Sequence, residues 1–127
     1  MMMYNRCLTC YNYRMISIEV ILPKKISTNT IYAGKHWAVR KKEADMYHEE
    51  FLDKKVEKIT DYPININYIF EFKGKPLDTS NCSYMAKLLE DGMVKKGIIE
   101  DDDPKYVAFT GIYSQKGTQD KVTIIIS

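Results

Sequence analysis

The chain has 127 residues, of which 45% are hydrophobic, and its formal net charge is +2. This length is typical of one domain, and the hydrophobic fraction excludes a wholly disordered chain. No apolar run approaches the roughly 18–20 residues that cross a membrane, and residues 1–15 lack the apolar region of a secretory signal. We therefore expect a cytoplasmic protein without a membrane partner.

The N-terminal segment, residues 1–15, has no clear periodicity, and we expect a flexible extension there, followed by one folded domain over residues 16–127. The chain contains three cysteines, Cys7, Cys10 and Cys82. Their odd number and wide spacing indicate a reducing compartment rather than a disulfide framework. Cys7 and Cys10 have the spacing of a zinc half-site, but no second cysteine or histidine pair follows, so two incidental thiols are the simpler interpretation.

The first elements of the domain are a strand, a polar loop and a helix. Residues 16–22 alternate and are rich in β-branched side chains, which predicts a strand ended by Pro23. Residues 23–36 form a polar and basic loop. From about Trp37 to Ile59 apolar residues recur near helical spacing, which predicts a helix with its apolar face toward the core. We expect Trp37 to enter the core, although stacking on a base or sugar is the alternative.

The second half of the domain adds a strand, a helix and two strands. Alternation over 64–72 predicts a strand with one buried face. A helix is expected to begin at residues 79–81, which are all good N-cap types, and to end at Gly97. Residues 106–113 and 121–126 predict two further strands, joined as a hairpin by the loop 114–119. The order β-α-β-α-β-β favours an α+β domain whose mixed sheet carries both helices on one face.

Charge is distributed unevenly along the domain. Residues 23–60 hold nine Lys/Arg against six Asp/Glu, whereas residues 71–103 hold eight acids against five bases. A basic half followed by an acidic centre suits a metal-dependent enzyme that acts on a polyanion, and ordinary solvated faces are the alternative. Phosphate-contacting candidates lie in the loop and the start of the following helix: Lys24, Lys25, Asn29, Lys35, Arg40, Lys41 and Lys42.

The central stretch from Asp78 to Asp103 gathers carboxylates from three places in the chain. Asp78 precedes the second helix, Lys87 and Asp91 lie one turn apart within it, and an acidic run, residues 100–103, follows Gly97. Carboxylates held together favour a cation among them, and Mg²⁺ prefers oxygen ligands. The sequence therefore predicts a magnesium site, with metal ligands drawn from Asp78, Asp91, Asp101 and Asp102.

A structural interpretation of the same residues stays open. Asp78 could cap the helix, Lys87 and Asp91 could be a surface ion pair, and the acidic run could be a solvated turn.

The stretch also resembles the RusA-type Holliday junction resolvases. The match consists of Asp78…Asn81, then Lys87, Asp91 and the ending Gly97-Ile98-Ile99-Glu100-Asp101-Asp102, and it extends over roughly residues 16–126. A weaker similarity covers the loop from Pro23 to Tyr32. The chain departs from the family pattern at Ser80, where the family has a second acid. Three extra residues also separate Asn81 from Lys87, so the gap can instead be placed toward Ser83 and Tyr84.

This resemblance implies that residues 16–127 are a RusA-like nuclease domain of the kind that phages and prophages carry. It implies a Mg²⁺-dependent homodimer, with Mn²⁺ as a substitute metal, that cleaves four-way junctions of double-stranded DNA in recombination and repair. The catalytic residues implied are Asp78, Lys87, Asp91 and Asp102. Because Ser80 replaces an acid, a junction-binding module with impaired catalysis is the alternative. A third possibility is a small interaction protein whose acidic run binds a basic partner.

Overall fold

The computed structural model describes residues 15–32 and 36–127, so Cys7, Cys10 and Lys35 lie outside the described residues. Within that part of the chain, four strands form one mixed sheet: β1 (Ile16–Ile21), β2 (Ile64–Phe72), β3 (Val107–Lys116) and β4 (Lys121–Ile126). Three α-helices accompany them: α1 (Asn29–Tyr32), α2 (Trp37–Glu49) and α3 (Ser83–Lys96). No helix in the described chain is long and apolar enough to cross a membrane.

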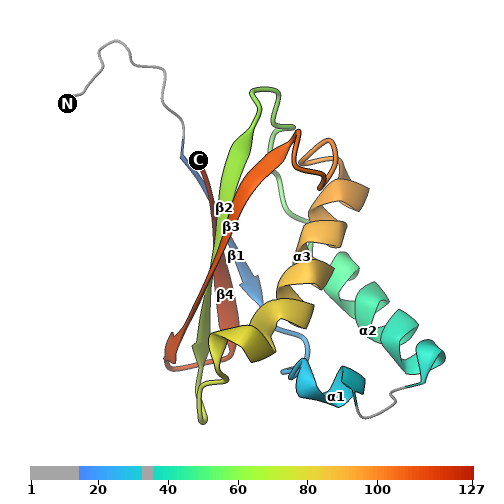
Figure 1. Ribbon diagram of the computed structural model, residues 1–127, viewed down its shortest axis with the longest axis vertical. Coiled ribbons are helices and arrows are strands. Elements are labelled where there is room, and N and C mark those ends of the chain that lie inside the picture. The colour runs from blue at the N-terminus through green and yellow to red at the C-terminus, as the bar shows by residue number, and fades with distance from the viewer. Residues whose placement is uncertain (1–14, 33–35) are drawn as a thin grey trace.

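The sheet has the strand order β1-β4-β2-β3, and the helices cover one of its faces (Figure 1). β1 and β2 each pair with β4 in antiparallel fashion, while β2 and β3 are parallel. Parallel neighbours need a long crossover connection, and α3 supplies it. The predicted α+β class, with a mixed sheet and two main helices on one face, is confirmed.

Inward-facing side chains of the strands and of α3 build the core. β2 and β4 alternate strictly between buried and more exposed positions, as expected for strands with one covered face. Tyr68, Phe70 and Phe72 of β2 are at most 1% exposed, and they lie in the same buried cluster as Met85 and Leu89 of α3. The predicted strands 64–72 and 121–126 are confirmed with the same bounds.

The predicted hairpin between the last two strands is wrong. β3 and β4 follow one another in the chain, yet β2 lies between them in the sheet. The connection crosses the end of β2, where the Gly117 N–H donates to the Phe72 carbonyl and the Lys73 N–H donates to Asp120 Oδ1. A short turn is compatible with either arrangement, and β2, the longer of the two strands that pair with β4, takes a central position with every second residue buried.

The helix predicted from Trp37 to Ile59 ends ten residues early, at Glu49. The chain turns there because Phe51 inserts into the core beside Gly92, where a Cβ atom would lie 2.8 Å from the Phe51 ring. Ile59 is buried as expected, but it lies in irregular chain that bonds to the Ile98 carbonyl through its N–H at 2.8 Å. Trp37, expected in the core, is 66% exposed at the start of α2.

The turn that closes α3 gives a test of backbone strain. Gly97 ends the helix with φ of 88°, in the left-handed region, and an added Cβ would meet nothing within 4 Å in the described chain. Gly97→Ala should therefore lower the free energy of unfolding by about 1–2 kcal/mol through backbone conformation alone. Urea denaturation measures this change.

Gly74→Ala is the matched control for this variant. An added Cβ at Gly74 also meets nothing within 4 Å of the described residues, and no left-handed φ is required there. Its free energy of unfolding should stay within about 0.5 kcal/mol of the wild type. Equal effects of the two substitutions would contradict the assignment of strain to Gly97.

Candidate active site

The Lys87 ammonium group is the centre of an acidic cluster, defined here as Lys87, Glu90, Asp91 and Asp102. Lys87 Nζ donates a hydrogen bond to Asp102 Oδ2 and lies 3.2 Å from Asp91 Oδ1 and 3.6 Å from Glu90 Oε1. Three of these residues come from α3, and Asp102 comes from the loop that follows the helix. The structure therefore brings together three predicted site residues and one, Glu90, that was not predicted.

The charges of the acidic cluster do not balance. One ammonium group faces three carboxylates, which leaves a surplus of negative charge when all are ionised. The hydrogen bond to Asp102 raises the pKa of Lys87, and the same bond holds the pKa of Asp102 below its ordinary value. Burial raises the pKa of Glu90, against the opposing effect of Lys87. Such a surplus favours the binding of a further cation.

The end of α3 determines where Asp102 lies. After the turn at Gly97, Ile98 and Ile99 are each 1% exposed and anchor the chain in the core. The Asp102 N–H then donates to Asp101 Oδ1 at 2.7 Å, which shapes the acidic turn from within. Asp101 is exposed, and its carboxylate accepts from the N–H of the neighbouring Asp102, whereas the Asp102 carboxylate accepts from Lys87.

A groove adjoins the acidic cluster between α3 and the edge strand β3. It has a volume of about 210 Å³. Lys87, Glu90 and Ser83 of α3 line it, together with Tyr68 of β2 and residues Thr110 and Ile112 of β3.

A larger cavity of about 410 Å³ lies elsewhere, lined by Leu52 and by residues of α2 and α3 that include His48 and Lys95. It contains none of the predicted site residues. We take the smaller groove as the candidate site because Lys87 and Glu90 of the acidic cluster line it.

Asp78, predicted as a catalytic residue and metal ligand, lies just before α3. It stands at the N-cap of a 3₁₀ turn (η1, Thr79–Cys82) that leads into α3, and within the described residues its side chain makes no capping hydrogen bond. No ion pair in that part of the chain joins it to the acidic cluster. Nor do the described residues contain a group of three or more His, Cys, Asp or Glu side chains arranged to hold a metal ion.

The basic loop before α1 docks where η1 meets the start of α3. The Thr28 N–H donates to the Asn81 carbonyl at 2.9 Å, and Thr28 Oγ1 lies 3.1 Å from Ser83 Oγ. Because Ser83 lines the groove, this docking places the basic loop beside it.

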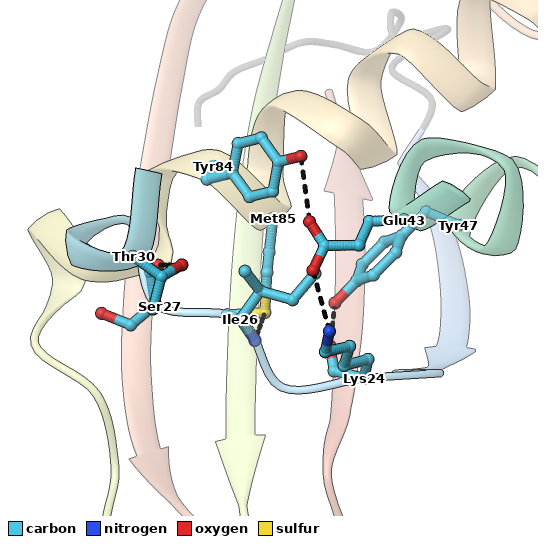
Figure 2. Close-up of polar contacts among 8 residues, drawn as sticks. All are labelled: Lys24, Ile26, Ser27, Thr30, Glu43, Tyr47, Tyr84 and Met85. Carbon is cyan, nitrogen blue, oxygen red and sulfur yellow. Dashed lines mark hydrogen bonds and ion pairs between the residues drawn. The ribbon is translucent and has the colours of Figure 1, made fainter. Parts of the chain in front are cut away.

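The predicted phosphate-contacting residues differ in exposure and in the partners that their side chains have within the described chain. Lys24 Nζ pairs with the buried Glu43 at 3.0 Å (Figure 2). Lys25 Nζ donates to the Lys75 carbonyl at 2.7 Å. The remaining described candidates are exposed: Asn29, Arg40, Lys41 and Lys42. Of these, Lys41 pairs with Asp45 at 3.2 Å.

Sequence reasoning missed Glu90 and Tyr68 as site residues. Glu90 is three residues after Lys87, so helical spacing alone places it on the same face. Tyr68 looks like an ordinary core residue in the β2 alternation, and its position beside the groove depends on the parallel pairing of β2 with β3.

No family model matches this chain, and no curated protein matches it.

Replacing Lys87 by Met tests the electrostatic centre of the cluster. The pKa of Asp102 should rise toward its ordinary value of about 4, since the bond from Lys87 is the largest cause that holds it low. A carboxyl group with a lowered folded-state pKa stabilises the fold above its unfolded pKa, and this stabilisation is lost as pH falls through the folded pKa. The variant should therefore be less stable at neutral pH, by under about 1 kcal/mol because Lys87 is half exposed.

NMR titration of the Asp102 carboxyl carbon measures the pKa, and urea denaturation near pH 7 and pH 3 measures stability. Lys41→Met is the control, because it breaks an exposed ion pair on α2 and should leave Asp102 unchanged. An Asp102 that titrates alike in wild type and Lys87→Met would contradict the assigned role of Lys87.

Proposed function

We propose that this protein is a Mg²⁺-dependent, structure-selective endodeoxyribonuclease that hydrolyses phosphodiesters in branched double-stranded DNA, including four-way junctions, during recombination and repair. The observation that supports this most is the convergence of Glu90, Asp91 and Asp102 on Lys87 beside a groove. The resemblance of the stretch from Asp78 to Asp102 to the RusA-type resolvases adds the substrate class.

The donor set suits Mg²⁺. This ion takes hard oxygen ligands and is commonly held by one or two carboxylates, with waters and substrate phosphates completing its coordination, so a closed cage of protein ligands is not required. Asp91 and Asp102 are the carboxylates that would hold it, because both are partly exposed and both face a region of surplus negative charge. When bound, Mg²⁺ supplies an activated water and charge relief on the transition state.

Lys87 has two tasks in this proposal. Its ammonium group holds Asp91 and Asp102 in one place, and it offers a positive charge to a phosphate that enters the groove. The raised pKa of Lys87 keeps this charge in place at every physiological pH. Glu90 belongs to the same site and adds a third carboxylate to it.

DNA would approach across the basic loop and the start of α2. Arg40 and Lys42 are exposed at the first turns of this helix, where cations oppose the helix dipole. The loop that precedes α1 docks next to Ser83, which lines the groove. Paired cuts across a junction need two active sites, and the proposal therefore includes a homodimer.

Cleavage of a labelled four-way junction tests the proposed activity. In Mg²⁺ the wild type should cut the junction, and Asp102→Asn should reduce the rate more than about 100-fold because it removes a ligand and the partner of Lys87. Asp45→Asn, an exposed aspartate on α2, is the control and should cut like the wild type. Absence of cutting by the wild type, or full activity of Asp102→Asn, would contradict the proposal.

A junction-binding module without catalysis is the second candidate, favoured by Ser80 at the position of the family's second acid. It predicts that the wild type binds the junction with ordinary salt dependence but does not cut it in Mg²⁺. Ser80→Asp would then restore cutting, since the Ser80 side chain is exposed and tolerates the change. Wild-type cleavage excludes this candidate.

A further inference from the structure

Tyr68 carries a buried hydroxyl group that lacks a hydrogen-bond partner in the described part of the chain. The residue is only 1% exposed. Other tyrosines at the core have a hydrogen-bond partner for their hydroxyl group. The Tyr47 hydroxyl donates to the Lys24 carbonyl, and the Tyr62 hydroxyl donates to the Ile59 carbonyl at 2.8 Å. An unsatisfied buried donor is costly, so a phenylalanine would serve the core better than Tyr68 does.

The position of Tyr68 links this donor to the candidate site. Tyr68 is paired with Ile112 across β2 and β3, and both residues line the groove together with Lys87 and Glu90. Burial and the nearby Glu90 and Asp91 carboxylates raise the pKa of the Tyr68 hydroxyl. The hydroxyl therefore stays protonated and remains a hydrogen-bond donor at neutral pH.

The size and chemistry of the groove indicate the kind of group it accepts. Its volume of about 210 Å³ lies below the roughly 300–1,000 Å³ of sites that enclose a whole small molecule. It thus suits one portion of a larger ligand. An ammonium group and a hydroxyl donor at one groove match an anionic oxygen, and the apolar Ile112 wall suits the sugar carbons that adjoin a phosphate.

We propose that Tyr68 is a binding residue of this groove, whose hydroxyl donates a hydrogen bond to a non-bridging oxygen of a DNA phosphodiester that Lys87 also contacts. The inference rests on the proposed function for the identity of the ligand as DNA. The hydroxyl is shielded from solvent in this structure, so the proposal requires the half-exposed Lys87 side chain to shift when a phosphate enters the groove.

The test compares wild type, Tyr68→Phe and Tyr47→Phe in the full chain. The probe is a thymidine dinucleotide, which carries one phosphodiester, and the readouts are its affinity by NMR titration and the thermal unfolding midpoint. Tyr68→Phe should lose roughly 10-fold in affinity, as for a hydrogen bond to a charged acceptor, while its unfolding midpoint stays equal or rises. Tyr47→Phe should show the reverse: unchanged affinity and a lower midpoint, because its hydroxyl has a partner.

The outcomes separate this inference from the proposed nuclease activity. Wild-type cleavage of junctions, combined with equal dinucleotide affinity of wild type and Tyr68→Phe, would overturn the role of Tyr68 and leave the nuclease intact. Loss of dinucleotide affinity in Tyr68→Phe, combined with a wild type that neither binds nor cuts junctions, would support a phosphodiester subsite and overturn the branched-DNA function. Failure of the wild type to bind the dinucleotide, or a destabilised Tyr68→Phe with wild-type affinity, would also overturn the inference.

Discussion

The contact between Lys87 and Asp102 joins the two parts of the connection between β2 and β3, namely α3 and the loop that follows it. A parallel pair requires a crossover, and here the crossover is α3 followed by the loop that returns to the start of β3. Gly97 ends the helix, and Ile98 and Ile99 fix the returning chain in the core. Asp102 is thereby held against a helix face that already carries Glu90 and Asp91. The site is thus a consequence of the crossover geometry.

A second constraint comes from Glu43, which is 1% exposed on α2. Its carboxylate accepts from Lys24 at 3.0 Å and from the Tyr84 hydroxyl at 3.3 Å, so it ties the basic loop, α2 and α3 together (Figure 2). Burying a carboxylate carries a large desolvation cost, which these partners offset. The cost is consistent with a need to hold the basic loop in one orientation beside the groove. Lys24 accordingly anchors the loop, whereas Arg40 and Lys42 are exposed.

Periodicity and turn chemistry predicted most of the elements, because they are local properties. The bounds of β2 and β4 and the end of α3 at Gly97 follow from alternation and from a residue suited to left-handed backbone. The sheet order does not follow in this way, since a short loop before β4 is compatible with a hairpin or with a strand between. The early end of α2 depends on the contact of Phe51 with Gly92, which is a tertiary effect.

The candidate site was likewise predictable only where it depends on local sequence spacing. Helical spacing brings Lys87 and Asp91 together, but the arrival of Asp102 requires the folded loop, and Tyr68 requires the strand pairing. Ser80 raised the question of a missing acid, and its side chain is exposed outside the acidic cluster. Three carboxylates surround Lys87 in the folded chain, because Glu90 adds one that is not part of the RusA-like motif. The surplus of negative charge around Lys87 therefore does not depend on an acid at position 80.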